Sequence, residues 1–256
     1  IEECWELVRT YEATAVPCMM LENCCYGRNE LAILNMVKKG VMGELIHCQC
    51  GYQHDIRDNI IKWGIENQHY RLKQYLNRNG DLYPTHGIGP IAMCLNINRG
   101  NRFLSLTSMS SKSRGIRSWI VDNLGEEHPM AQTEVNQGDI VTTMIKCAHG
   151  ETVLVIHDTT LPRPYSRAGR VQGTKGIWME DNNSIYVLGQ SPKHTWESFD
   201  DYRDKYEHPL WKEYIELGVR GGHGGMDYLC LRAFVESVKE KTLTPIDVYD
   251  TATWMA

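Results

Sequence analysis

The chain has 256 residues, of which 42% are hydrophobic and 23% are charged, a composition that is ordinary for a globular protein. Its formal net charge of -5 argues against a nucleic acid or an anionic membrane surface as the partner. No apolar run approaches the roughly 18 residues of a membrane span. The nine cysteines lack framework spacing, which argues against a disulfide scaffold.

The first 50 residues alternate between helical and extended patterns. Apolar residues recur at helical spacing in two segments, and a short apolar run follows each of them. The expected order is a helix over 1–13, a strand over 15–22, a helix over 28–39 and a strand over 44–52. This order is typical of the back half of a doubly wound α/β domain.

Polar side chains stand where the two predicted strands end. Glu22 closes the first strand, and Tyr52 and His54 follow the second. Because ligands of doubly wound domains bind at the carboxyl ends of strands, these residues are candidates for a site. Cys48 and Cys50 share one strand face, where cysteine behaves as a small hydrophobe. Their spacing does not favour zinc, and no metal is expected.

The stretch from residue 77 to 90 carries the strongest chemical signal of the chain. Residues 56–82 predict a loop and a short helix, and a further helix is expected over 86–97. Between them, Tyr83 and His86 lie three residues apart, among glycines and prolines that fix the backbone direction. A histidine can act as base and then as acid near neutral pH. The structural alternative is a loop before a helix, with His86 as a capping residue.

From residue 103 onward the apolar period changes to two, which predicts strands. The candidate strands cover 103–112, 139–147, 151–160, 168–180 and 184–189, and helices are expected over 199–241 and 246–256. The predicted fold class is α/β plus α+β: the remnant of a Rossmann-like domain followed by a large open antiparallel β-sheet flanked by helices.

Three regions are predicted along the chain. Residues 1–50 would be the C-terminal part of the Rossmann-like domain, and residues 51–235 an α+β domain for substrate binding and dimerisation. Residues 236–256 would pack back on the first region. Because large antiparallel sheets commonly bury one face on a partner subunit, a homo-oligomer through the sheet is expected.

Several separated segments together carry a family resemblance. They are Met19–Asn23, Gly51–Asp55, residues 77–90, Arg163–Tyr165, His223–Tyr228 and Asp247–Tyr249. In this order they resemble the NAD-dependent α-N-acetylgalactosaminidases of glycoside hydrolase family 109, within the glucose–fructose oxidoreductase/inositol dehydrogenase superfamily. The glycine-rich G-x-G-x-x-G turn of that superfamily has no match. The resemblance implies that roughly 100 or more residues precede Ile1, so that this chain alone would bind NAD poorly.

The resemblance implies a retaining glycosidase that removes terminal α-N-acetylgalactosamine with NAD as its cofactor. The implied route is oxidation at C3, elimination across C1 and C2, addition of water and reduction at C3, so the cofactor ends unchanged. His86 would be the base at the C3 hydroxyl. Tyr52 would be the base at C2, with its pKa lowered by a neighbouring cation or by His54.

The resemblance also implies a role for each candidate residue. The catalytic residues are His86, Tyr52 and Tyr83; the substrate-binding residues are Arg71, Tyr83, His86 and Tyr165; the cofactor-binding residues are Glu22, Asn23 and His54. Structural alternatives stay open for two of them. Glu22 could cap the helix near Arg28, and Tyr52 could be a strand-end aromatic with a solvated hydroxyl.

The residues leave two other functions open. One is an NAD(P)-dependent sugar or polyol dehydrogenase of the same superfamily, against which Leu82 counts, because dehydrogenases usually place an aspartate there. The other is a truncated, non-catalytic domain that binds sugar or oligomerises. The expected partner is a terminal amino sugar, free or on a glycan. The cellular location, cytoplasm or bacterial periplasm, is left open.

Overall fold

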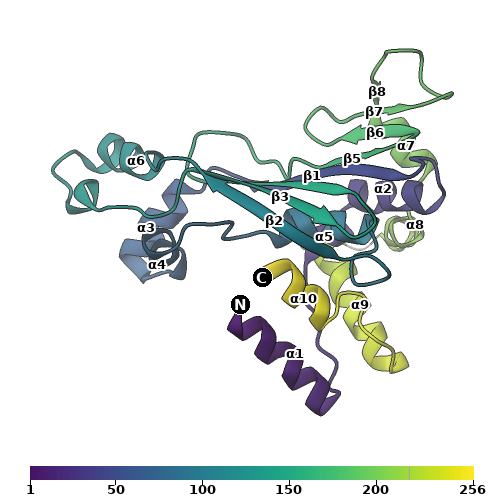
Figure 1. Ribbon diagram of the computed structural model, residues 1–256, viewed down its shortest axis with the longest axis horizontal. Coiled ribbons are helices and arrows are strands. Elements are labelled where there is room, and N and C mark those ends of the chain that lie inside the picture. Colours follow the sequence, from purple (N-terminus) through teal and green to yellow (C-terminus); the bar gives the residue numbers. More distant parts are fainter. Residues whose placement is uncertain (219) are drawn as a thin grey trace.

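An eight-stranded mixed sheet organises the part of the chain that the computed structural model describes, residues 1–218 and 220–256. The strands lie in the order β2-β3-β4-β1-β5-β6-β7-β8, with α5 and α10 on one face (Figure 1). They are β1 (Leu45–Gln53), β2 (Phe103–Ser110), β3 (Ile140–Cys147), β4 (Thr152–Asp158), β5 (Arg170–Gly173), β6 (Gly176–Met179), β7 (Ser184–Val187) and β8 (Glu197–Ser198). The predicted open sheet with flanking helices is confirmed.

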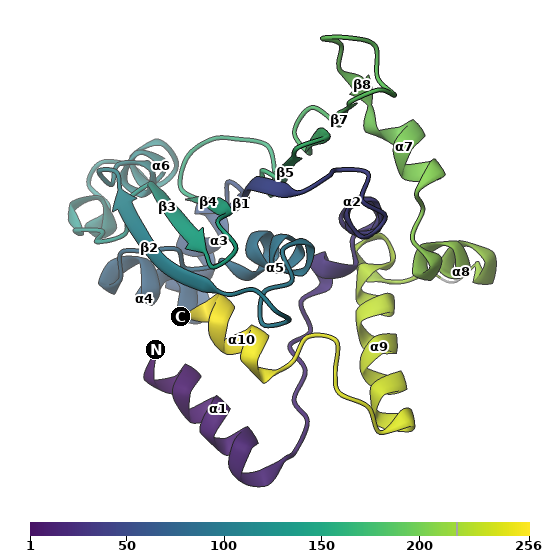
Figure 2. The same cartoon turned by 45° about the vertical axis from the view of Figure 1, so that its right-hand side comes forward.

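Helices gather at both ends of the sheet and below its middle. They are α1 (Glu2–Thr14), α2 (Arg28–Lys38), α3 (Arg57–Asn67), α4 (Tyr70–Asn77), α5 (Thr85–Cys94), α6 (Gly115–Leu124), α7 (Phe199–Lys205), α8 (Pro209–Leu217), α9 (Met226–Glu240) and α10 (Val248–Met255), with 3-10 turns η1 (Asn23–Tyr26), η2 (Pro129–Gln132) and η3 (Gly222–Gly225). The group α3, α4 and α6 lies at one end of the sheet, and α2, α7 and α8 lie at the other (Figure 1). α1 lies outermost, against α10 (Figure 2).

The sheet departs at its centre from the antiparallel sheet that the sequence predicts. β1 runs parallel to β4, whereas the other paired strands are antiparallel. A parallel pair needs a long crossover, and the chain from α3 through β3 provides it. The single strand expected over 168–180 is also wrong. It is the β5–β6 hairpin, because Thr174 and Lys175 form a turn.

The strand expected over residues 15–22 does not form. Pro17 has no N–H to offer to a strand ladder, and the Met20 N–H bonds instead to the carbonyl of Ile246, at 3.3 Å. Glu22 therefore does not end a strand. It stands before η1, where its carboxylate accepts the N–H of Cys24 at 3.0 Å. Glu22 thus caps η1, whereas the helix that begins at Arg28 has no side-chain cap at Gly27.

Two helical predictions also need correction. Residues 56–82 hold both α3 and α4, where a loop and one short helix were expected; Gln68, with a φ of 51°, ends α3 in a left-handed conformation. The helical stretch expected over 199–241 is broken, because Pro209 starts α8 and Gly218 ends it. Residue 219, which that prediction includes, lies outside the described residues.

α5 approaches β1 more closely than two side chains would allow. A Cβ atom on Gly87 would lie 2.5 Å from the backbone nitrogen of Gly51, so Gly87 lets the helix approach the backbone of the strand. Cys48 and Cys50 of β1 pack into the same core at 0% and 1% exposure, as their shared strand face predicts. Each of the nine cysteines is a free thiol in the part of the chain that the structure describes.

The two ends of the chain lie together. The rings of Tyr11 in α1 and Tyr249 in α10 have centroids 5.7 Å apart, and the termini are neighbours in Figure 2. The division into regions 1–50, 51–235 and 236–256 stays a prediction. Over the described ranges, no helix is both long and apolar enough to cross a membrane.

Candidate active site

Four aromatic side chains meet around Tyr52. Its ring centroid lies 4.7 Å from that of Tyr83, 5.6 Å from His86, 5.9 Å from His54 and 6.2 Å from Tyr165. These residues come from three separated segments of the chain. The structure therefore brings five of the predicted site residues into one cluster.

The end of β1 and a backbone bridge assemble one half of this cluster. Tyr52 and His54 are two residues apart, so both side chains leave β1 on the same side. Gln53, between them, exchanges two backbone hydrogen bonds with Ser166, at 3.0 and 2.8 Å. That bridge holds the neighbouring Tyr165 beside them, with its ring edge-on to His54 at 5.0 Å.

The first turn of α5 supplies the other half. The carboxylate of Asp81 accepts the N–H of Tyr83 at 3.0 Å, an aspartate turn that holds the backbone in place before Pro84. Tyr83 and His86 are three residues apart across the helix start, which brings their rings to 4.7 Å at an angle of 89°. The glycine contact between α5 and β1 then aims both residues at Tyr52.

Glu22 reaches this cluster as the partner of His86. Its Oε1 atom lies 2.7 Å from Nδ1 of His86, so the carboxylate favours the tautomer with hydrogen on Nδ1 and a lone pair on Nε2. Burial of Glu22 favours its neutral form, yet the hydrogen bond and charge of His86, with hydrogen bonds from Thr85 and Cys24, hold its pKa below the usual value of a glutamate. Glu22 is therefore a carboxylate at neutral pH and orients the imidazole.

This lowered pKa makes an acid-side prediction. A carboxylate whose pKa is lowered by folding stabilises the fold above its unfolded pKa and loses that stabilisation as the pH falls. In Glu22→Gln the difference in unfolding free energy from the unaltered protein should shrink as the pH falls from about 6 to about 3. Urea unfolding at several pH values measures this difference. A difference that stays constant over that range contradicts the prediction.

The pKa of Tyr52 moves opposite to the expectation. Burial raises it, while the positive charge of Arg71 lowers it only in part. The Tyr52 hydroxyl lies 3.2 Å from Nδ1 of His54, and burial lowers the pKa of His54 despite the nearby carboxylates of Asp55 and Asp58. A neutral His54 with its lone pair on Nδ1 accepts a hydrogen bond from the phenol, which keeps its proton. The two side chains therefore form a donor–acceptor pair rather than a preformed phenolate.

The predicted Arg71 lies at the rim of the cluster. Its guanidinium carbon is 5.8 Å from the ring centroid of Tyr83 and 5.2 Å from that of Tyr70. Burial raises the pKa of Tyr83 to about 12, with the carboxylate of Glu22 also favouring the neutral phenol. Arg71 and Tyr83 thus offer a charged donor fork and a neutral hydroxyl at the same edge.

Asn23 is turned toward α9 rather than toward the aromatic cluster. Its side-chain amide donates to Oδ1 of Asp227 at 2.7 Å, and Nδ1 of His223 lies 2.8 Å from the other oxygen of that carboxylate. These contacts tie η1, which follows Glu22, to the first turn of α9. Asn23 thereby helps to fix the segment that carries Glu22.

A family model covers most of the chain. Residues 26–256 match the family model described as the C-terminal domain of glycosyl hydrolase 109. The chain belongs to glycoside hydrolase family 109. The matched range includes Tyr52, His54, Tyr83, His86 and Tyr165. Glu22 and Asn23 stand just before it.

Relatives in this family are longer than the chain. An alpha-N-acetylgalactosaminidase of Tannerella forsythia is 50% identical over 273 aligned positions, which cover 100% of this chain and 58% of the relative. A glycosyl hydrolase family 109 protein of Parabacteroides distasonis is 46% identical, with 100% of this chain and 59% of the relative covered. The chain thus spans somewhat over half the length of these relatives.

Solved structures of oxidoreductases have a similar fold. An NAD binding oxidoreductase from Klebsiella pneumoniae superimposes with a TM-score of 0.73 at 15% identity, over 99% of this chain and 65% of that one. An inositol dehydrogenase homolog from Azotobacter vinelandii, complexed with NAD+, gives a TM-score of 0.62 at 14% identity, over 99% and 64%. At such identities the likeness shows the fold.

In this family 109 chain, three side chains could in principle hold a metal ion. Glu22, Cys24 and His86 each place a ligand atom within 4.8 Å of the other two. Burial raises the pKa of the Cys24 thiol well above its usual value, and Arg167 only partly offsets this. Because metals bind the thiolate, the site favours a protonated Cys24 and the direct hydrogen bond between Glu22 and His86.

A buried polar network under Tyr83 was missed by sequence reasoning. Nδ1 of His157, which is 1% exposed, lies 3.2 Å from the carboxylate of Asp81, and Nε2 lies 3.4 Å from the hydroxyl of Tyr75. Asp81 thus links the backbone of Tyr83 to β4 and α4. The available signal was a histidine at an inward position of an alternating strand, which needs a partner when buried.

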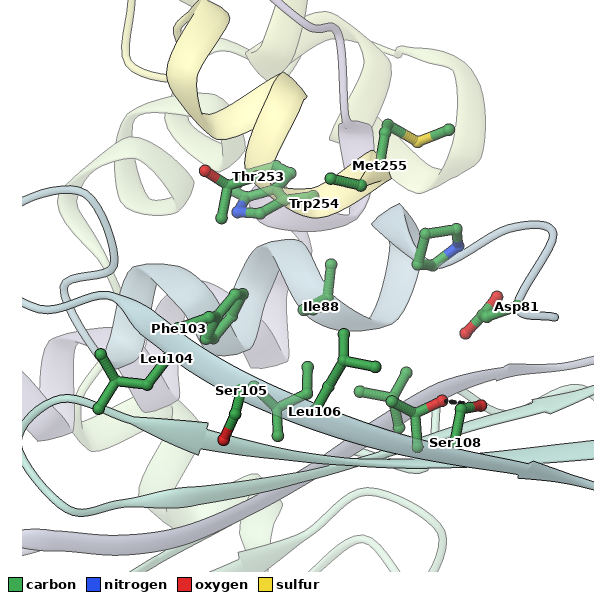
Figure 3. A pocket seen from close by; sticks show the side chains of 15 residues that line it. Asp81, Ile88, Phe103, Leu104, Ser105, Leu106, Ser108, Thr253, Trp254 and Met255 are labelled. Carbon is green, nitrogen blue, oxygen red and sulfur yellow. Dashed lines mark hydrogen bonds between the residues drawn. The ribbon is translucent and has the colours of Figure 1, made fainter. Parts of the chain in front are cut away.

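A large cavity of the family 109 chain lies between α5, α10 and β2. It measures about 510 Å³, and Figure 3 shows it between Trp254 and its neighbours in α10, Ile88 of α5 and Leu104 to Ser108 of β2. Among the described residues, its lining includes none of the aromatic cluster. Its walls are mainly apolar, whereas a sugar needs polar partners for its hydroxyls. The candidate active site is therefore the cluster around Tyr52.

Proposed function

We propose that the protein carrying this chain is a retaining glycosidase that removes terminal α-N-acetylgalactosamine by an NAD-dependent route. The observation that carries the proposal is the bond between Glu22 and His86 beside the tyrosines of the cluster. This contact places a base next to the neutral phenols of Tyr52, Tyr83 and Tyr165. Most glycosidases use a pair of carboxylates, whereas Glu22 is the one carboxylate among these five residues. The 50% sequence identity with an alpha-N-acetylgalactosaminidase of Tannerella forsythia supports the choice of sugar.

His86 would take the proton of the C3 hydroxyl. Its Nδ1 hydrogen is directed to Glu22, so the Nε2 lone pair is the available base. When Nε2 gains the proton, the imidazolium lies 2.7 Å from a buried carboxylate, which stabilises the new charge. The same proton can return to the C3 oxygen when the cycle closes.

Tyr52 would take the proton from C2 once a carbonyl at C3 has acidified it. Because burial raises the pKa of Tyr52, its phenolate forms only as the phenolic proton passes to Nδ1 of His54, 3.2 Å away. Tyr52 then gains the C2 proton while His54 holds the phenolic one. Loss of the C1 substituent completes the elimination, and water adds at C1 in the return direction.

The donor set fits the reactive end of a nicotinamide cofactor. Oxidation of a secondary alcohol removes a proton and a hydride together, and the His86 imidazole is suited to the proton. NAD, once bound, supplies the reversible acceptance of the hydride. Glu22 and His54 would stand on the nicotinamide side, with Asn23 holding the segment of Glu22 through Asp227. Arg71, Tyr83 and Tyr165 would bind the sugar.

Isotope transfer tests this proposal. The natural protein that carries this chain should hydrolyse an aryl α-N-acetylgalactosaminide, and a deuterium label at C2 should pass to the solvent during turnover. NADH, followed by its absorbance, should not accumulate. Retention of the label rules out the elimination route, and steady NADH formation without hydrolysis identifies a sugar dehydrogenase instead.

We infer that the sheet face opposite α5 and α10 joins two copies of the chain. In the aligned pairs of β2, β3 and β4, Thr107, Met144 and Leu154 share one face. On this face Met109 is 74% exposed and Met144 is 44% exposed. Apolar side chains across neighbouring strands make a flat surface of the kind that a two-fold dimer buries.

A charge on that face should dissociate the assembly. Met144→Glu places a carboxylate in the proposed interface, where burying it without a partner is unfavourable. Sedimentation equilibrium should show an oligomer for the unaltered protein and a monomer for the variant. Ile215→Glu, on an exposed position of α8, is the matched control and should leave the mass unchanged. A monomeric unaltered protein contradicts the inference.

A further inference from the structure

We propose that Arg167 is a positioning residue that fixes Tyr165 as a hydrogen-bond donor toward the bound sugar. Its Nη1 atom donates to the Tyr165 hydroxyl at 3.2 Å, and the guanidinium carbon lies 5.7 Å from the centroid of the same ring. The presence of a sugar beside Tyr165 rests on the proposed function. The contact between the two side chains does not.

Two carboxylates hold Arg167 from behind. Its Nη2 atom forms an ion pair with Glu30 of α2 and lies 3.5 Å from Glu180, which directly follows β6. The side chains of these three residues are 16%, 6% and 17% exposed, in the order Arg167, Glu30 and Glu180. A guanidinium held by two nearly buried carboxylates keeps one orientation, because its planar donors are fixed relative to each other.

The backbone makes room for this arrangement at two glycines. A Cβ atom on Gly27 would overlap the carboxylate of Glu30, and one on Gly169 would lie 3.0 Å from Glu180 and 2.8 Å from the ring of Trp178. The Gly169 N–H also donates to Glu180, at 2.8 Å. Close backbone approach of this kind needs glycine.

The turn that directs Arg167 inward has an uncommon conformation. Ala168 has a φ of 52°, a left-handed conformation that a residue with a Cβ atom adopts at a cost. Its N–H is held by the hydroxyl of Ser166 at 2.7 Å, and Ser166 is bridged to Gln53 of β1. The segment from Tyr165 to Gly169 is thus fixed on both sides.

The direction of the Tyr165 hydroxyl follows from these contacts. Arginine has donors and no acceptor, so Arg167 can only occupy a lone pair of the phenol oxygen. The hydroxyl hydrogen then has to point elsewhere, and the polarised phenol becomes a stronger donor. Since Tyr165 is 45% exposed and its ring packs edge-on to His54, the hydrogen is available to an acceptor oxygen of the sugar.

The contact can be tested without any sugar. In the natural protein labelled with carbon-13 at tyrosine Cζ, the signal missing from Tyr165→Phe is that of Tyr165. This signal should shift in Arg167→Met and return part of the way in Arg167→Lys. Arg203→Met is the control, because Arg203 is similarly buried and pairs with Asp200 and Asp204 instead. If the chemical shift of the Tyr165 signal does not change in Arg167→Met, the proposal is overturned, whatever the enzyme activity.

A double-mutant cycle then tests the effect on the sugar. Tyr165→Phe and Arg167→Met should each raise KM by about tenfold, with a smaller change in kcat. If Arg167 acts through Tyr165, the double variant should show about the same tenfold increase. An increase of about one hundredfold in the double variant means that the two residues act separately, which overturns the proposal.

A triple variant controls for the two carboxylates that Arg167→Met leaves without their partner. Removing the guanidinium alone leaves Glu30 and Glu180 unpaired in a nearly buried position, which destabilises folding. The triple variant Arg167→Met, Glu30→Gln, Glu180→Gln removes the three charges together and serves both experiments if the single variant does not fold. The same Tyr165 signal shift and the same non-additive KM are expected from it.

Discussion

Gly87→Ala should lower the free energy of unfolding by about 3 kcal/mol, because the added methyl group has no room between α5 and β1. The new Cβ would lie 2.5, 2.7 and 2.9 Å from the backbone N, O and Cα atoms of Gly51. Backbone atoms of a central strand cannot move aside as a flexible side chain could. The helix would have to shift instead, and it carries His86 at its first turn.

The comparison with Gly80→Ala makes this result specific. In a helix, alanine is usually more favourable than glycine by up to about 1 kcal/mol, so Gly87→Ala has the opposite sign from the ordinary expectation. Gly80 lies in the same stretch, and a Cβ atom there would meet nothing within 4 Å. Gly80→Ala should leave stability unchanged or raise it slightly. Urea unfolding of both variants measures the difference, and equal stabilities would contradict the contact.

Local spacing was sufficient to find much of the candidate site. Tyr83 and His86 are three residues apart, and Tyr52 and His54 are two apart, so each pair shares one side of a helix start or a strand. The punctuation by Pro84 and Gly87 also marked the start of α5, within one residue of its observed position at Thr85. Patterns of this kind depend only on neighbouring residues, which a sequence displays directly.

Contacts between distant segments could not be predicted in this way. Glu22 and His86 are 64 positions apart, and Pro17 prevents the strand that was expected to present Glu22. The parallel pairing of β1 with β4 likewise depends on the path of the long connection from α3 through β3. The period-two pattern of a strand does not determine that path. The direction of the Tyr52 pKa shift depends on burial and on Arg71 together, and both follow from the assembled fold.

The backbone conformation of single residues could not be predicted from the sequence either. Gln68 and Ala168 adopt left-handed backbone conformations, although neither residue type favours them. The ion pairs of Arg167 and the bond from the Gly169 N–H to Glu180 constrain both neighbours of Ala168. A sequence pattern predicts the commonest conformation of a residue, and such positions depart from it only after the rest of the site has formed.

His86→Gln should reduce kcat by about 10²- to 10⁴-fold, the usual contribution of a positioned acid–base group. A glutamine amide can still donate to the carboxylate of Glu22, so the fold around η1 should persist, but it cannot take a proton from the C3 hydroxyl. Hydrolysis of an aryl α-N-acetylgalactosaminide measures kcat, and release of C2 deuterium should fall in parallel, because oxidation at C3 precedes that step.

Glu22→Gln separates the base from the residue that orients it. The glutamine side chain keeps the shape but offers less stabilisation to the imidazolium, so kcat should fall, but by less than in His86→Gln, which loses the base itself. His149→Gln, in the exposed turn after β3, is the control and should keep full activity. Near-normal turnover in His86→Gln would contradict the proposed role of His86 as the base at the C3 hydroxyl.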